Sequence, residues 1–290
     1  MDRRHAEGAL DLVSRIPRIV LEARRVAMAT VHGAHGRRRA GVGENFWQFR
    51  PFTSGEPATR IDWRRSARDD RAFVREREWE AAHTIALWID LSASMGFQSK
   101  LAMTPKIDRA LIVGLALADM LVRAGERVGM LGGAPASASR EIIEKLAETI
   151  AHAHRDGFDD LPPHVPLSSL SEAVVIGDLL APAGEIVQSI EAISSRGARG
   201  HIMIVADPVE EVFPYSGHAE IFDLEIGAKL RVGDAGEFRN RYLSRLAEHR
   251  DIIRDACRRR GWSFAVHRTD RTASEALLGL VARVAAGRKG

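Results

Sequence analysis

The chain has 290 residues, of which 45% are hydrophobic and 28% charged, the balance of an ordinary soluble globular protein. Its single cysteine, Cys257, excludes an internal disulfide and a cysteine-based zinc site. The longest apolar run, residues 110–118, is about half of what a membrane-spanning helix requires, and the Arg-rich first thirty residues do not look like a secretory signal. We therefore expect a cytoplasmic protein without its own anchor.

The net charge is +3, from 42 basic and 39 acidic side chains, but it is unevenly distributed. Residues 1–80 contain 17 Arg against 12 Asp or Glu, which gives +5. Because the acids alternate with the arginines, the excess favours a solvated, internally paired segment over a surface for nucleic-acid phosphates.

The first stretch, up to about residue 32, is expected to be helical, and Pro17 either kinks this helix or begins a second one. Its apolar residues recur at helical spacing: Leu10, Val13, Ile16, Val20, Ala23 and Ala27. From about residue 33 to residue 80, glycines alternate with aromatic residues, which predicts loops and short strands ordered by aromatic packing. Trp63 and Phe73 are the expected core residues of this segment.

From about residue 81 onward, apolar runs alternate with helical patterns. The expected strands are residues 84–90, 127–131, 173–178, 201–207, 219–225 (paired with 229–232) and 262–267. The expected helices are residues 106–125, 139–154, 182–195, 237–260 and 274–286. This alternation predicts an α/β fold with a doubly wound, mainly parallel sheet. We divide the chain into an N-terminal segment, residues 1–80, and an α/β domain, residues 81–290.

Polar side chains follow the first and third strands of this predicted sheet. Asp90, Ser92 and Ser94 form an Asp-x-Ser-x-Ser pattern in a strand-to-helix loop, and Asp178 ends a neighbouring strand. A carboxylate with two hydroxyls suits a hard divalent cation such as Mg²⁺, which binds six oxygens at about 2.1 Å. The alternative interpretation is that the serines cap a helix and that Asp90 merely ends a strand.

In this loop the sequence resembles the von Willebrand factor A fold and its metal-ion-dependent adhesion site. The resemblance implies that Asp90, Ser92 and Ser94 hold Mg²⁺, or Mn²⁺ or Ca²⁺ in its place, directly or through water. Asp178 would assist from outside the inner coordination sphere. One coordination position would stay open for a Glu or Asp of a partner protein.

A second set of motifs narrows the resemblance. Upstream stand Gly41-Val-Gly43-Glu-Asn-Phe46, Arg50-Pro-Phe52, Gly55-Glu56, Arg60-Ile-Asp62-Trp63-Arg64, Ala67-Arg68 and Val74-Arg75-Glu76, and downstream Asp207-Pro208, Glu210, Pro214, Asp223 and Glu225. Together they resemble the family called domain of unknown function 58 over about residues 20–280. The resemblance implies a non-enzymatic adaptor that works with a MoxR-type AAA+ ATPase in assembling or activating other complexes.

The sequence departs from the adhesion-site pattern at one position. The second loop of that site offers a Thr, whereas residues 161–170 of this chain contain none. Ser168 or Ser169 is the expected substitute for this hydroxyl, and water is the alternative.

Two other functions compete with the adaptor. Asp90 could be the nucleophile of a metal-dependent phosphoester hydrolase, which would also need a second acid and a lysine against the phosphate. The arginine-rich run could bind a partner or nucleic acid through Arg60, Arg64 and Arg65, although pairing with local acids is the expected role. No phosphate-binding Gly-x-x-x-x-Gly-Lys-Ser/Thr loop is present, so the chain is not itself such an ATPase.

Overall fold

The structure is a computed structural model. It describes residues 3–34, 47–53, 56–68, 71–77, 83–156, 160–222 and 228–287. The chain forms two compact units, one of residues 1–33 with 83–290 and one of residues 34–82.

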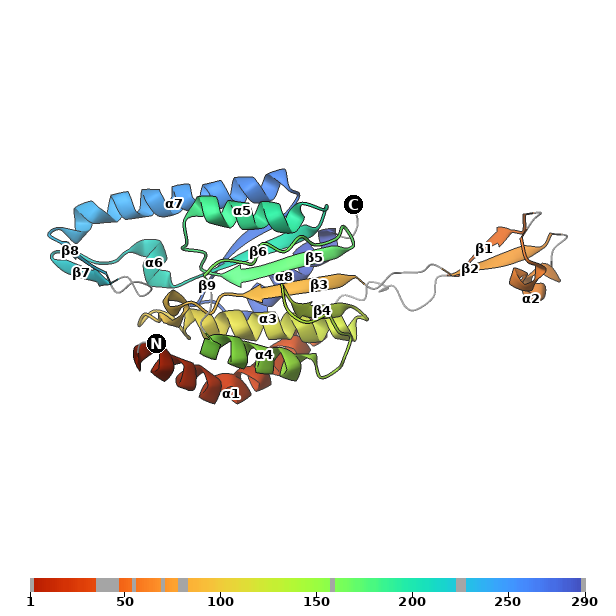
Figure 1. Cartoon of the computed structure of the whole chain (residues 1–290), viewed down its shortest axis with the longest axis horizontal. Coiled ribbons are helices and arrows are strands. Elements are labelled where there is room, and N and C mark those ends of the chain that lie inside the picture. The colour runs from red at the N-terminus through yellow and green to blue at the C-terminus, as the bar shows by residue number, and fades with distance from the viewer. Residues whose placement is uncertain are drawn as a thin grey trace. The chain divides into compact units, whose positions relative to one another are not determined.

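The larger unit is built on a five-stranded parallel sheet, as the strand–helix alternation predicts (Figure 1). Its strands are β3 (Thr84–Ile89), β4 (Arg127–Met130), β5 (Ser171–Gly177), β6 (Arg199–Ala206) and β9 (Ser263–Arg268). They lie in the order β4-β3-β5-β6-β9. Every residue of β5 is buried, which explains why this strand reads as one continuous run rather than as an alternating pattern.

Helices cover both faces of this sheet (Figure 1). Side chains of Ile85, Leu87 and Ile89 point into one core, and those of Ala86 and Trp88 into the other. The first core is closed by α1 (Arg3–Ala34), α3 (Lys106–Arg123), α4 (Ile142–Asp156) and α8 (Ala273–Gly287). The second is closed by α5 (Ala183–Ser194) and α7 (Ala235–Arg259). The α/β class and its mainly parallel sheet are thereby confirmed.

The expected N-terminal helix is present as α1, a single helix with Pro17 inside it, so Pro17 does not begin a second helix. Its place differs from expectation, because α1 belongs with the sheet rather than with residues 34–80. Leu12, Ile19 and Ala23 are buried in the first core. An ion pair from Arg15 to Asp108 of α3 adds to this packing. The division at residue 80 therefore does not follow the compact units.

Shorter elements follow two of the strands. The 3-10 helix η2 (Ala93–Gly96) comes after β3, and α6 (Pro208–Val212) comes after β6. An antiparallel hairpin of β7 (Ala219–Phe222) and β8 (Lys229–Val232) leads into α7, as predicted, although residues 223–227 lie outside the described part of the chain.

The smaller unit is a two-stranded antiparallel sheet of β1 (Trp47–Pro51) and β2 (Phe73–Arg77), with η1 (Ala58–Arg60) and α2 (Trp63–Ser66) between them. The expected short strands are therefore present. The role given to Trp63 is wrong, because its side chain is 66% exposed. Phe73 is half-buried and is covered instead by the Arg65 guanidinium, 4.7 Å from the ring centre.

Arg64 is exposed, and the side chain of Arg60 lies outside the described part of the chain.

Within the described residues, no helix has both the length and the apolarity needed to cross a bilayer.

Candidate functional site

The candidate site lies where the chain leaves two adjacent parallel strands, β3 and β5. Numbered along the sheet alone, the strand order is 2-1-3-4-5, and β3 and β5 are its first and third strands. The connections leave these two strands in opposite directions, and such a switch point is where open α/β sheets bind ligands. Asp90 and Asp178 are the residues directly after these strands, and both are buried.

Asp90 is held against β5 at a position where only glycine leaves enough room. Its backbone N–H donates to the carbonyl of Ile176 at 2.9 Å, which extends the strand ladder by one residue. A Cβ on Gly177 would lie 2.5 Å from the Asp90 Cβ and 2.8 Å from its Oδ2. The glycine therefore fixes how closely the two strand ends approach.

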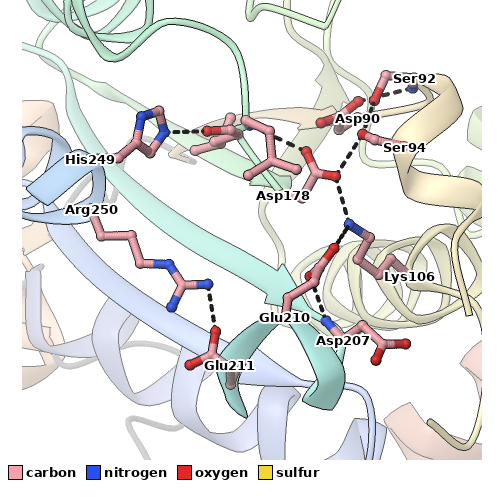
Figure 2. Close-up of polar contacts among 12 residues, drawn as sticks. Asp90, Ser92, Ser94, Lys106, Asp178, Asp207, Glu210, Glu211, His249 and Arg250 are labelled. Atoms are coloured by element: carbon pink, nitrogen blue, oxygen red, sulfur yellow. Dashed lines mark hydrogen bonds and ion pairs between the residues drawn. The ribbon is translucent and has the colours of Figure 1, made fainter. Parts of the chain in front are cut away.

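The hydroxyls of the Asp-x-Ser-x-Ser loop gather beside these two carboxylates (Figure 2). The Ser92 N–H donates to Asp90 Oδ1 at 2.9 Å, which curls the loop over the acid. Ser92 Oγ lies 3.2 Å from Ser94 Oγ, and Ser94 Oγ donates to Asp178 Oδ2 at 2.6 Å. The structure thus brings together the four predicted metal-site residues Asp90, Ser92, Ser94 and Asp178.

A strained turn sets the direction of Asp178. The next residue, Leu179, has φ 51°, a left-handed backbone that costs a non-glycine residue about 1 kcal/mol or more. Leu179 is fully buried, and its carbonyl accepts a hydrogen bond from His249 Nε2 at 2.7 Å (Figure 2). Helix α7 therefore holds the turn that aims Asp178 at Ser94.

Lys106 is the site residue that sequence reasoning did not place. It is the first residue of α3, its side chain is 1% exposed, and its Nζ donates to Asp178 Oδ2 at 2.8 Å and to Glu210 Oε1 at 2.5 Å (Figure 2). Burial lowers the pKa of Lys106, but the attraction of Asp178 and Glu210 outweighs burial and raises the pKa above its usual value. The lysine is therefore a charged ammonium within the site.

Glu210 reaches Lys106 from the start of α6. Asp207 caps this short helix by accepting from the Val209 N–H at 2.9 Å, and Glu210 Oε2 accepts from the Asp207 N–H at 2.8 Å, which completes a capping box. Asp207 Oδ2 also accepts from the Ser99 N–H at 2.8 Å. Both oxygens of Asp207 are thus engaged by backbone, and its role is to hold α6 and the loop after β3 together.

The loop residues fit a small, hard cation. Neighbouring ligands of an octahedral Mg²⁺ with bonds of about 2.1 Å lie about 3.0 Å apart. The 3.2 Å between Ser92 Oγ and Ser94 Oγ is close to that separation. Asp178 is at hydrogen-bonding distance from Ser94, so it positions this hydroxyl rather than adding an inner ligand. Among the described residues, no three or more His, Cys, Asp or Glu side chains form a metal-binding group, so two hydroxyls are essential to this donor set.

The expected replacements for the missing Thr are in the wrong place. Ser168 and Ser169 precede β5, whereas the site follows it. Six residue steps of β5 separate Ser171 from Gly177, or about 20 Å at 3.3 Å per residue. Ser168 Oγ lies within hydrogen-bonding distance of Ser171 Oγ, at 3.0 Å, beside the start of β5, whereas the site lies beyond the end of this strand. Neither serine can supply the hydroxyl.

Comparison with known proteins places the chain in a family. A family model described as "Protein of unknown function DUF58" matches residues 48–252, more than two thirds of the chain. The chain belongs to this family. It is also 26% identical over 277 residues to uncharacterized proteins of Mycobacterium bovis and Mycobacterium tuberculosis, a match that covers 90% of this chain and 84% of theirs.

Two solved structures are similar in outline. One is the conserved hypothetical protein BatB from Bacteroides thetaiotaomicron, with 14% identity and a TM-score of 0.42. The other is an aerotolerance-related membrane protein from Bacteroides fragilis, with 14% identity and a TM-score of 0.41. Each comparison covers 71% of this chain and 100% of the other.

Proposed function

We propose that this chain is a non-enzymatic adaptor with a von Willebrand factor A-like domain, which binds an acidic side chain of a partner protein through a divalent cation. The convergence of Asp90, Ser92 and Ser94 at the switch point is the observation that supports this most directly. When bound there, Mg²⁺ would supply an open coordination position for the partner's carboxylate.

The site residues have different roles toward the cation. Asp90, Ser92 and Ser94 would hold the cation. Asp178 Oδ2 accepts a hydrogen bond of 2.6 Å from the Ser94 hydroxyl, and this orients the hydroxyl so that its oxygen lone pairs would face the cation. The buried setting of Asp90 lowers the effective dielectric constant and strengthens its attraction for a cation.

The surroundings of the site favour a protein as the ligand. Large apolar side chains are exposed in the segments that follow β3, β5 and β6: Leu101 (56%), Met103 (65%), Leu180 (51%), Val212 (39%) and Tyr215 (45%). Exposed apolar side chains of this kind, next to polar groups, are typical of protein-binding surfaces. An acidic residue of the partner would then reach the site, while apolar side chains of the partner cover the exposed apolar side chains of this chain.

One observation bears on the hydrolase alternative. A phosphotransfer site needs a lysine near its aspartate, and Lys106 lies in this cluster. However, Asp90 and Lys106 are each only 1% exposed, and Lys106 is bonded to two carboxylates. A nucleophile must reach its substrate, so this burial favours binding over turnover.

The test is a pull-down of the suspected partner, a MoxR-type AAA+ ATPase, by the purified chain in Mg²⁺ or in EDTA. We expect capture in Mg²⁺ that Asp90→Ala abolishes and Asp178→Ala weakens, because the first loses a ligand and the second only its orientation. Asp251→Ala, an exposed acid on α7, is the matched control and should bind like the wild type.

Capture that survives EDTA would refute the role of the cation. Turnover of a generic phosphoester that Asp90→Asn abolishes would establish the hydrolase instead. Binding of DNA that weakens steeply with salt would favour the nucleic-acid alternative.

A further inference from the structure

The buried Lys106 ammonium already neutralises part of the negative charge at these strand ends, through its ion pairs with Asp178 and Glu210. Asp178 Oδ2 accepts the Ser94 hydroxyl at 2.6 Å and the Lys106 ammonium at 2.8 Å, so one carboxylate oxygen serves both groups. The ammonium is therefore one carboxylate away from the loop hydroxyls. Its other partner, Glu210, comes from a different strand end.

The charges of the cluster show what the lysine does. Four acids lie at these strand ends, Asp90, Asp178, Asp207 and Glu210, and each side chain is buried or partly buried. Both oxygens of Asp207 accept backbone N–H groups, so they are already hydrogen-bonded. Buried charges are stable only when they are paired or hydrogen-bonded. Lys106 pairs with two of the four without any ion from solution, so the strand ends can fold with no metal bound.

From these contacts we propose that Lys106 is a tethered cation that pairs with Asp178, repels a divalent ion at the adjacent hydroxyls, and so sets how weakly the Asp90–Ser92–Ser94 loop binds metal. This inference rests on the proposed function of that loop. A positive charge beside the loop repels a second cation, and it also attracts the carboxylate that orients Ser94. Metal binding should therefore be weak in the free protein and strengthen when a partner carboxylate adds its charge.

The size of the effect follows from Coulomb's law. Lys106 Nζ lies 2.8 Å from the Asp178 oxygen that accepts from Ser94 Oγ at 2.6 Å, so the ammonium is only a few ångströms from the hydroxyl that would hold the ion. For charges on the order of 6 Å apart, even with the dielectric constant of water, a unit positive charge weakens the binding of a divalent ion about ten-fold. Removal of the ammonium should therefore tighten metal binding by about ten-fold or more. A structural lysine without this role would leave the metal affinity unchanged.

The experiment measures Mg²⁺ and Mn²⁺ affinity of the full chain by isothermal titration calorimetry. The variant is Lys106→Met, with folding checked by circular dichroism. A second variant, Lys106→Met with Glu210→Gln, removes one charge of each sign and serves where the single change does not fold. The matched control is Lys145→Met on α4, which removes an exposed lysine and makes the same change in net charge.

We expect metal binding to be about ten-fold tighter in Lys106→Met than in the wild type or Lys145→Met, and to be lost when Asp90→Ala is added. Wild-type binding that Lys106→Met leaves unchanged would overturn the role of Lys106 while the metal site stands. No binding in any protein, Lys106→Met included, would overturn both this inference and the cation in the proposed function.

A measurement on the wild type keeps the inference testable if neither lysine variant folds. The Lys106 ammonium is buried, so its ¹⁵N-labelled Nζ should give a slowly exchanging NMR signal. This signal should shift as Mg²⁺ is added, because the ion would bind the Ser94 hydroxyl that donates to the same Asp178 oxygen as the ammonium. A signal that stays fixed while the ion binds would refute the coupling between the two cations.

Discussion

The substitution Gly177→Ala tests whether the approach of the two strand ends builds the site. The new Cβ would lie 2.5 Å from the Asp90 Cβ, and ordinary contact begins at 3.4 Å, so the two strand ends must separate by about 0.9 Å. Metal ligands tolerate displacements of about 0.2 Å. Overpacking of this kind typically costs about 1–3 kcal/mol. We therefore expect a loss of stability in this range together with a loss of metal binding.

The assay is urea unfolding followed by circular dichroism, with and without millimolar Mg²⁺. Gly184→Ala is the matched control, because a Cβ on Gly184 in α5 meets nothing within 4 Å. That variant should be slightly more stable, by up to about 1 kcal/mol, and should keep its response to the ion. If Gly177→Ala proves as stable and as responsive to Mg²⁺ as Gly184→Ala, the close approach of Asp90 and Gly177 does not position the site.

Three further expectations concern other residues. Burial, with a smaller effect of Arg109, lowers the pKa of His267 to about 4 from its ordinary 6.5. Between pH 6.5 and pH 4 the unfolded chain therefore binds a proton that the folded chain does not, so the free energy of unfolding should fall by about 3 kcal/mol, as measured by urea titration. This fall should be smaller in His267→Gln. In His152→Gln, a control at an exposed site, the fall should be as large as in the wild type. Burial also raises the pKa of Cys257 to about 12, so iodoacetamide should label this thiol only after unfolding, and rapid labelling of the native chain would contradict its burial. Ser168→Ala should leave the thermal shift with Mg²⁺ unchanged, and a reduced shift would return this serine to the site.

The sequence was sufficient to predict the sheet and the meeting of Asp90 with Asp178. Fully buried strands such as β5 produce short continuous apolar runs, and parallel strands bring their carboxyl ends to one edge. Two acids that end such runs therefore lie near each other whatever the details of the loops. The Ser92 and Ser94 positions follow because they are only two and four residues from Asp90.

Residues whose place depends on packing were predicted less well. The order of residues in the chain favours Ser168 and Ser169 as ligands, but order does not tell at which end of the strands a segment with several prolines lies. The size and apolarity of Trp63 predict a core position, yet a unit of only two short strands has little core to bury it in. Helix α1 is amphipathic, and this pattern does not identify the surface against which a helix packs.

Lys106 shows most clearly what the pattern of residues leaves open. Its four-carbon stem and charge are typical of a surface residue, and nothing in the spacing from Asp90 sets it apart from the exposed Lys100. The sequence signal for a cation at this place lies around Glu210, which pairs with Lys106, in the sequence Asp207-Pro208-Val-Glu210. An Asp, a Pro in the first turn and a Glu three residues after the Asp form a capping box, which fixes Glu210 at the start of a helix just after a strand. One oxygen of Glu210 is committed to the cap, and the other pairs with Lys106 Nζ. A partly buried acid at this position favours a cation beside it, and α3 begins with one. A lysine that begins a helix, as Lys106 does, is therefore the kind of residue that supplies the cation at these strand ends.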